Sequence, residues 1–281
     1  LDYHGKIGND FSYNIAGNIS TYKNKVLSLG GGTNIPGKTH LGNQVNTMIE
    51  PGKPIGYFYG YKMDGVFQTQ EEINNYRGGP DNTIIMPTAE PGDLKFVDLN
   101  GDGKLGEEDR TMIGNPHPDF TFGLTLSGEY KGFDLSMFFQ GSVGNDILNI
   151  LKYDIYSGTG WYNAPKDIFD KFWTGPGSTN ENFAISANSR DNLTMSEWYI
   201  ENGSYVRLKN VTLGYTFPKQ WVQKLTVQNL RLFVAAQNLF TITSYSGLDP
   251  ELGNSNPAFM GIDMGWYPQA RSFMVGLSLK L

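Results

Sequence analysis

The sequence predicts an all-β fold, an antiparallel transmembrane β-barrel with long extracellular loops, and three observations support this prediction. Seven segments alternate apolar and polar residues with a period of two, the pattern of strands that have one apolar face. The connections between these segments are alternately short and long. The chain is rich in glycine (35 of 281 residues) and in aromatic residues (14%), which is a β composition, and it has no apolar run long enough for a transmembrane helix.

Charge and cysteine content narrow the function classes. The formal net charge is -6 and no basic stripe is present, which argues against nucleic acid as a partner. The absence of cysteine excludes a disulfide scaffold but leaves the compartment open. Because the chain opens directly into strand-like sequence without a methionine, we expect a targeting region upstream of Leu1.

The first strand pair is predicted before residue 21. A short opening strand leads through a turn at residues 7–10 into residues 11–20, where Phe11, Tyr13 and Ile15 alternate with polar or small residues. A long connection of roughly residues 23–119 follows. It is the first of three such connections, and it contains the most specific motif of the chain.

The clearest hairpin is predicted at residues 120–140. Residues 120–130 alternate strictly, Lys131 and Gly132 form a tight turn, and residues 133–140 continue the same apolar face. Phe138 is the exception, because it falls on the polar face. A second long connection covers roughly residues 142–203, and its aromatic side chains are candidates either for substrate contact or, more in keeping with a long loop, for a small core of its own. These aromatic residues are Tyr153, Tyr156, Trp161, Tyr162, Phe169, Phe172, Trp173, Trp198 and Tyr199.

The last three strands are predicted at residues 205–217, 230–240 and 272–281. The first of them alternates less cleanly, since Arg207 and Lys209 share a parity with Val211 and Leu213. A strand needs about ten residues to cross the apolar zone, so these two charges are expected above the bilayer at the outer end of a longer strand. A third long connection, 241–271, precedes the last strand, in which Phe273, Val275, Leu277 and Leu279 alternate with polar or small residues.

Strict alternation of connections gives the barrel an orientation. The short connections near Gly8, near Gly132 and at residues 218–229 correspond to periplasmic turns, and the long ones to extracellular loops. The last strand then runs towards the periplasm. Since single-chain bacterial barrels have an even number of strands, we expect the remaining strands upstream of Leu1.

A calcium site is predicted at residues 98–109. Oxygen donors occur at loop positions one, three, five and twelve, and a glycine at position six allows the sharp turn that a calcium loop requires. Position seven contributes a backbone carbonyl, so a basic side chain there is compatible with the site. A metal-free surface turn is the alternative, because Asn-Gly and Asp-Gly are common turn pairs. The expected metal ligands are Asp98, Asn100, Asp102, Lys104 through its carbonyl, and Asp109.

Several motifs occur together in an order that resembles one known family. The chain is similar to the carboxyl-terminal barrel portion of SusC/RagA-type TonB-dependent outer-membrane transporters, and the resemblance covers nearly the whole chain. It rests on the calcium-like loop and on the following motifs: Lys53-Pro54-Ile55-Gly56-Tyr57-Phe58-Tyr59-Gly60-Tyr61, Pro91-Gly92-Asp93-Leu94-Lys95-Phe96, Ile113-Gly114-Asn115-Pro116, Tyr130-Lys131-Gly132-Phe133-Asp134-Leu135-Ser136, Tyr205-Val206-Arg207-Leu208-Lys209-Asn210-Val211-Thr212-Leu213-Gly214-Tyr215, Ala236-Gln237-Asn238-Leu239-Phe240 and Tyr267-Pro268-Gln269-Ala270-Arg271.

The resemblance implies a function and an architecture. Members of this family, which is typical of Bacteroidetes, close a plugged barrel of about 22 strands, and these seven would be the last. They import a large nutrient, a glycan oligomer or a peptide, through the outer membrane, beneath a SusD-like lipoprotein lid and with energy from TonB. The chain would then not be an enzyme, and the substrate-binding residues are unknown.

Two other function classes stay open. A secreted calcium-stabilised β module that binds carbohydrate or a host surface would bury the same apolar faces in a sandwich core. A β-rich glycoside hydrolase would need two carboxylates about 5–10 Å apart across a cleft, a pair that sequence alone does not locate. Because short and long connections alternate, the membrane barrel is favoured over both.

Overall fold

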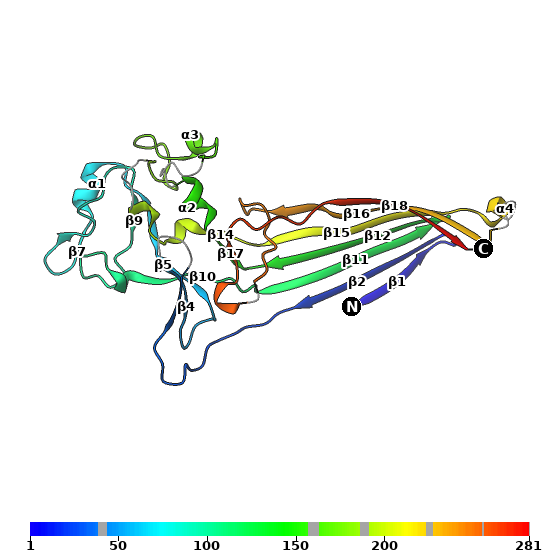
Figure 1. Ribbon diagram of the computed structural model, residues 1–281, viewed down its shortest axis with the longest axis horizontal. Helices are drawn as coiled ribbons and strands as arrows, with labels where there is room; N and C mark the ends of the chain where they lie inside the picture. The colour runs from blue at the N-terminus through cyan, green and yellow to red at the C-terminus, as the bar shows by residue number, and fades with distance from the viewer. Residues whose placement is uncertain (39–43, 157–162, 186–190, 223–226, 255, 281) are drawn as a thin grey trace.

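The computed structural model describes residues 1–38, 44–156, 163–185, 191–222, 227–254 and 256–280. A long antiparallel sheet extends from one side of a compact group of loops (Figure 1). No helix within the described residues is both long and apolar enough to cross a membrane. Both the shape and the strand pattern agree with the all-β prediction.

The long sheet has seven strands in the order β1-β2-β11-β12-β15-β16-β18, and every neighbouring pair is antiparallel. Its strands are joined at one end by short turns, and the loops leave from the other end (Figure 1). The strands are β1 (Asp2–Ile7), β2 (Phe11–Ser20), β11 (Phe120–Tyr130), β12 (Phe133–Val143), β15 (Tyr205–Thr216), β16 (Asn229–Thr243) and β18 (Ser272–Lys280).

All seven predicted strands are confirmed, as are the turns between the hairpin strands. Gly8 (φ 63°) turns β1 into β2, and Lys131 (φ 46°) with Gly132 (φ 88°) forms the two-residue turn between β11 and β12. Positive φ at both central residues is the conformation that suits the right-handed twist of a hairpin. The third turn begins with helix α4 (Lys219–Val222), while residues 223–226 and Leu281 lie outside the described part of the chain.

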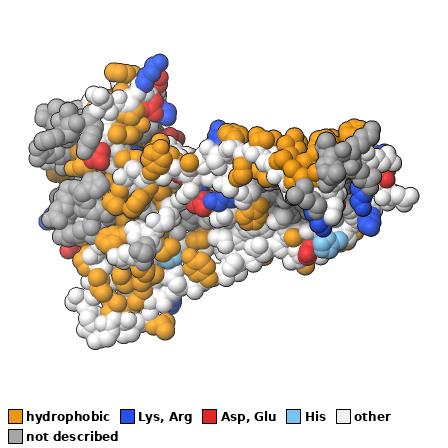
Figure 2. Space-filling view, turned by 45° about the vertical axis from the view of Figure 1, so that its right-hand side comes forward, with side chains coloured by type: hydrophobic (Ala, Val, Ile, Leu, Met, Phe, Trp, Pro, Cys, Tyr) orange, Lys and Arg blue, Asp and Glu red, His pale blue; other side chains and the backbone are white. Residues whose placement is uncertain are grey.

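One face of the sheet is apolar and exposed, and we call it the outward face. Residues paired across strands share a face, so the register fixes its members. Leu135 pairs with Leu213, Leu213 with Val234, and Val234 with Val275, and each of these side chains is exposed (38%, 46%, 48% and 74%). Figure 2 shows hydrophobic side chains gathered along this elongated part of the molecule. Among the described elements no second sheet covers this face, so the sandwich alternative is not favoured.

The opposite face, the inward face, is mainly polar. It carries Ser127 paired with Ser136 and Ser136 paired with Thr212, and an ion pair joins Arg231 to Asp134. Phe138, the exception in the predicted pattern, lies on this face, and its ring covers Gly123: a Cβ at that glycine would lie 3.2 Å from the ring. The aromatic ring therefore fills the space left by the glycine on the neighbouring strand.

A β-bulge in β15 corrects the prediction for the two charged residues of that strand. Leu208 pairs with Phe139 and Asn210 pairs with Phe138, so Lys209 is an extra residue without a partner on β12. One extra residue reverses the parity of everything before it. Arg207, paired with Gln140, therefore lies on the inward face and not with Val211 on the outward face. Both charges contact acidic residues of the third connection there, and their height above the bilayer stays a prediction.

The three long connections fold together into a loop domain, defined here as residues 21–119, 144–204 and 244–271. Its small sheets have the strand orders β10-β5-β4-β3, β14-β13-β17, β6-β9 and β7-β8. The elements are β3 (Ile35–Lys38), β4 (Val45–Ile49), β5 (Tyr57–Tyr61), β6 (Met63–Val66), α1 (Gln70–Asn75), β7 (Arg77–Gly78), β8 (Thr83–Ile84), β9 (Leu94–Phe96), η1 (Glu107–Asp109), β10 (Arg110–Gly114), β13 (Asp146–Asn149), α2 (Leu151–Tyr156), α3 (Ile168–Lys171), η2 (Asp191–Leu193), η3 (Glu197–Tyr199), β14 (Ile200–Asn202), η5 (Pro257–Phe259) and β17 (Ile262–Asp263).

The loop domain has one hydrophobic core to which all three connections contribute. Phe58 comes from the first connection, Tyr199 from the second and Ile262 from the third, and their exposures are 0%, 0% and 3%. Strand β17 pairs in parallel with β13, which ties the third connection to the second. The described parts of the long connections thus pack into one folded body at the end of the sheet opposite the short turns.

Candidate functional site

The predicted calcium loop is closed by hydrogen bonds of its own carboxylates. Asp98 accepts the N–H groups of Gly101 (2.7 Å) and Gly103 (2.8 Å), and Asp102 accepts that of Lys104 (2.9 Å). Asp109 is fully buried and accepts N–H groups from both ends of the loop: Leu99 at 2.8 Å and Gly106 at 2.7 Å. Asn100 Nδ2 lies 3.3 Å from Asp102 Oδ2. The predicted residues therefore belong to one compact turn.

This turn packs against the β7–β8 hairpin. Gly103 has a φ of 84°, and a Cβ there would collide with the carbonyl of Gly78. The Thr83 hydroxyl donates to the Gly103 carbonyl at 2.9 Å. Glycine at position six is therefore required both by its positive φ and by the close approach of the neighbouring backbone.

The donor set is chemically suited to a hard cation, since every predicted ligand atom is an oxygen. In the described residues, no three side chains from histidine, cysteine, aspartate or glutamate gather as a metal-binding group. The carboxylates are directed towards backbone N–H groups of the turn. Lys104 also belongs to the turn, and its backbone carbonyl is the atom that is predicted to coordinate the metal.

The aromatic residues of the second connection are mostly core residues. Phe172, Trp198 and Tyr199 are buried (5%, 6% and 0% exposed), and the rings of Phe172 and Trp198 meet edge to face with centroids 6.3 Å apart. Phe169 is the opposite case, at 83% exposed. Packing explains this set better than substrate contact does. Trp161 and Tyr162 lie outside the described residues.

A polar cavity that the sequence did not suggest lies between α2, α3, β14 and residues 246–248. Its volume is about 460 Å³, which is within the range of small-ligand sites. Two ion pairs line it: Lys152 with Glu201 (2.9 Å) and Lys171 with Asp167 (2.8 Å). The four elements come from two different connections, so no local sequence pattern could reveal this cavity.

The residues around Glu201 form a network that fixes the third connection beside the cavity. Glu201 accepts the N–H of Ser246 at 2.8 Å and the Nδ2 of Asn149 at 3.0 Å. Burial raises the pKa of the Glu201 carboxyl, but the Lys152 ammonium and the hydrogen bonds from Ser246 outweigh burial and leave the pKa below its ordinary value. Tyr245 donates its hydroxyl to Asp263 at 2.6 Å.

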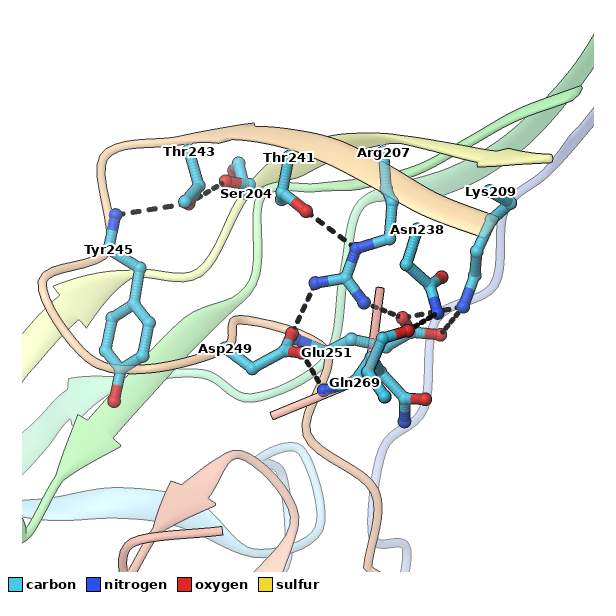
Figure 3. Close-up of polar contacts among 11 residues, drawn as sticks. Ser204, Arg207, Lys209, Asn238, Thr241, Thr243, Tyr245, Asp249, Glu251 and Gln269 are labelled. Atoms are coloured by element: carbon cyan, nitrogen blue, oxygen red, sulfur yellow. Dashed lines mark hydrogen bonds and ion pairs between the residues drawn. The ribbon is translucent and has the colours of Figure 1, made fainter. Parts of the chain in front are cut away.

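A second network, the anchor network, fixes the third connection to the inward face of the sheet (Figure 3). Arg207 is 3% exposed and donates to Asp249 and to Glu251, both at 2.6 Å. Lys209 donates to Glu251 at 2.8 Å, and the N–H of Gln269 donates to Asp249 at 2.8 Å. The anchor network consists of these five residues, and it depends on the bulge that turns Arg207 inward.

Comparison with known proteins identifies the family. No protein-family model matches the chain. The TonB-dependent receptor P3 of Formosa agariphila is 37% identical over 285 residues and covers 96% of the chain. The TonB-dependent receptor SusC of Bacteroides thetaiotaomicron is 28% identical and also covers 96% of it. The chain belongs to the SusC/RagA-type TonB-dependent receptors.

Solved structures of this family show the same fold. The RagAB peptide importer in its open-open state matches the whole chain with a TM-score of 0.72 at 20% identity, and the structure of the RagAB peptide transporter matches 99% of it with a TM-score of 0.73. SusC/RagA-type receptors are outer-membrane barrel proteins. The long sheet of this receptor is therefore part of an outer-membrane barrel wall, with the outward face towards lipid.

The matched region is only part of these proteins. The chain spans 27% of the length of receptor P3 and 24% of SusC, and 28% of the RagAB chain.

Proposed function

We propose that the receptor imports a large nutrient, a glycan oligomer or a peptide, through the outer membrane with energy supplied through TonB. The observation that carries this proposal is the two-faced sheet: its apolar outward face is exposed, and its polar inward face suits a hydrated passage. The 37% identical relative is named a TonB-dependent receptor. The named relatives are receptors and an importer, which supports transport and not catalysis as the role.

The proposed partner is a SusD-like lipoprotein that covers the loop domain. The loop domain lies at the end of the sheet opposite the short turns, which in a bacterial barrel is the extracellular end. Exposed apolar side chains occur on it, including Leu248 (65%), Trp266 (46%) and Tyr267 (91%). A lid that docks there would enclose substrate above the barrel.

Uptake and co-purification test this function together. The full-length receptor is extracted from its native outer membrane in mild detergent, and the proteins that accompany it are identified by mass spectrometry. A stoichiometric SusD-like lipoprotein is expected, together with loss of nutrient uptake in cells that lack either the receptor or TonB. Recovery of the receptor in the soluble fraction, or unchanged uptake without TonB, would contradict the proposal.

Calcium binding by residues 98–109 is a separate proposal, with a structural role. Asp98, Asn100, Asp102 and Asp109 would supply side-chain oxygens and Lys104 its carbonyl, and the metal would supply positive charge to a turn that is rich in carboxylates. Its support is the spacing of donors within one compact turn. A bound ion would order this part of the loop domain before a lid or ligand docks.

A titration tests the calcium proposal. Calcium added to the chelator-treated receptor is expected to release or absorb heat and to raise protease resistance at residues 98–109. The double variant Asp98→Ala, Asp102→Ala is expected to lose both effects. Equal heats and equal protease resistance in the variant and in the unmodified receptor would show that calcium does not bind here.

A further inference from the structure

An apolar groove lies on the outward face of the sheet near the short turns, and Gly128 of β11 forms its floor. Its volume is about 260 Å³. Tyr13 lies opposite Gly128 on the neighbouring strand, but its ring covers Gly5 of β1 instead. A Cβ at Gly128 would meet only the edge of the Phe11 ring, at 3.3 Å, so that ring borders the groove. A hollow therefore stays open on the face that contacts lipid.

The walls of the groove are aromatic beside the turn and aliphatic farther along the strands. Tyr130 and Phe133 lie at the turn end, and Leu126, Met137 and Leu213 lie beyond them. From Tyr130 to Leu126 the strand advances four residues, or about 13 Å. One leaflet supplies half of the hydrocarbon core, roughly 15 Å. The groove therefore has the length and the chemistry to hold one acyl chain.

A polar hollow continues from the groove around the turn between β11 and β12. Its volume is about 570 Å³, and it shares Tyr130, Phe133 and Asp134 with the groove. Lys131 and Asp10 line it and pair at 3.4 Å, with side-chain exposures of 59% and 57%. A pair this exposed adds little stability, so each charge can take another partner at small cost. The groove thus ends beside one exposed cation and one exposed anion.

We infer that the groove and the polar hollow bind one glycerophospholipid with a zwitterionic phosphoethanolamine head group. An acyl chain would lie over Gly128. The phosphate would pair with Lys131 and the ammonium group with Asp10, so that the two adjacent charges of the head group meet opposite charges of the protein.

This site goes beyond import and is continuous with the lipid-facing surface. SusC/RagA-type receptors are outer-membrane barrel proteins, and the outward face of the sheet is exposed and apolar around the groove. The short turns of a bacterial barrel lie at its periplasmic end, so the lipid belongs to the periplasmic leaflet (Figure 1).

Two groove-filling variants and one matched control test the position of the acyl chain. Leu135→Trp and Leu213→Trp each place a larger side chain in the groove, at positions that are 38% and 46% exposed. The control is Val234→Trp. Val234 pairs with Leu213 and so lies at the same depth, is 48% exposed, and is not among the described residues that line the groove.

Two charge variants test the head group. Asp10→Asn removes the negative charge and keeps the shape of the side chain. Lys131→Asn removes the positive charge and gives the turn an Asn-Gly sequence, which two-residue hairpin turns favour, so this variant is expected to fold. Native mass spectrometry of the full-length receptor in mild detergent measures the affinity for phosphatidylethanolamine and for phosphatidylglycerol with identical acyl chains.

The expected result is one phosphatidylethanolamine bound by the unmodified receptor and by Val234→Trp. Affinity should fall about tenfold or more in both groove variants and about threefold in Lys131→Asn. Asp10→Asn should abolish the preference for phosphatidylethanolamine over phosphatidylglycerol.

Three outcomes would overturn the inference. Equal affinity in the groove variants and in Val234→Trp would show that lipid contacts the wall without a defined site. Equal affinity of the unmodified receptor for both lipids would overturn the assigned head group. A second copy of the receptor bound in place of the lipid would overturn the assigned occupant.

Discussion

At the scale of single residues, close packing between strands depends on glycine. A Cβ at Gly276 would fall on the ring of Phe233, a Cβ at Gly141 on the ring of Phe122, and a Cβ at Gly5 on the ring of Tyr13. In the first pair the glycine and the aromatic residue lie opposite each other on neighbouring strands. The high glycine content of the chain thus has a packing role in the sheet as well as a role in turns.

Gly276→Ala is expected to destabilise the barrel by about 1–3 kcal/mol, because the added methyl group displaces the Phe233 ring from a packed position. The matched control is Gly17→Ala, where the nearest atoms to a new Cβ lie 3.8 Å away, an ordinary contact. Thermal unfolding of the full-length receptor in detergent measures both. Equal unfolding temperatures for the two variants would contradict the packing role.

Asp249 gives the anchor network a defined pH dependence. Burial raises the pKa of its carboxyl, but hydrogen bonds from Arg207 and from the N–H groups of Gln269 and Glu251 outweigh burial and lower the pKa below its ordinary value. A lowered folded-state pKa adds stability that is complete above the unfolded-state value, about 3.9, and is lost as pH falls through the lower folded value.

Attachment of the third connection is therefore expected to be constant from neutral pH down to about pH 4 and to weaken only below it. Hydrogen exchange at residues 246–252, corrected for the intrinsic rate at each pH, measures this. Asp249→Asn should lose protection already at neutral pH. A loss of protection near pH 6 in the unmodified receptor would be inconsistent with this role of Asp249.

At the scale of elements, the bulge at Lys209 determines how the third connection is attached to the sheet. Without the extra residue, Arg207 would face lipid with Val211, and Asp249 would lose its partner. The bulge continues into β16, where Asn238 and Leu239 lie opposite Lys209 and Asn238 adopts a φ of 51°. Because of this one inserted residue, Arg207 and Lys209 form ion pairs with the third connection, and Arg207 does not face lipid.

Arg207→Met is expected to free the third connection, because it leaves the carboxylates of Asp249 and Glu251 without their buried partner, at a cost of about 3–5 kcal/mol. Lys209→Met is the control, since Glu251 keeps its bond to Arg207. Limited proteolysis at residues 244–271 compares them. Similar cleavage rates in the two variants would show that Arg207 is not the principal attachment.

These particular elements show what the sequence could predict and what it could not. The strands were predictable because one apolar face repeats every second residue, as in residues 120–130. The bulge at Lys209 was not predictable from the sequence. A single extra residue shows itself only in the parity of Arg207 and Lys209, and a longer strand explains the same parity equally well. The polar cavity beside Glu201 was not predictable either. Its residues Asn149, Glu201 and Ser246 meet only after β13, β14 and the third connection have folded together. Calcium binding at Asp98–Asp109 stays a prediction.

At the scale of the whole molecule, the sheet has an exposed apolar face and, opposite it, a mainly polar face. Residues of one strand that lie on opposite faces are therefore expected to differ in how well they tolerate substitution by a charged residue. Val234 belongs to the outward face and Gln237 to the inward face of β16, where Gln237 pairs with Asn210 and Ser272. The same substitution at these two positions tests which face contacts lipid.

Val234→Arg is expected to impair barrel assembly by about 2–4 kcal/mol if the residue lies near the bilayer midplane, because a charge would be placed in lipid. Gln237→Arg should cost far less, since its side chain faces the polar side. The yield of heat-resistant folded receptor in the outer membrane measures both. A larger loss for Gln237→Arg than for Val234→Arg would reverse the assignment of the faces.

The most direct test of the two-faced barrel wall is a spin-label scan along β15 in the full-length receptor. The chain has no cysteine, so single cysteines can be placed at successive positions from 205 to 216, with any cysteine elsewhere in the receptor replaced by serine. Collisions with oxygen report lipid exposure, and collisions with a polar nickel complex report water. We expect lipid exposure at Val206, Val211, Leu213 and Tyr215, so that the alternation changes phase at Lys209. Leu208 lies on the same face but is only 4% exposed, so its signal should be weaker. A uniform alternation through position 209, or water exposure on both faces, would contradict the account.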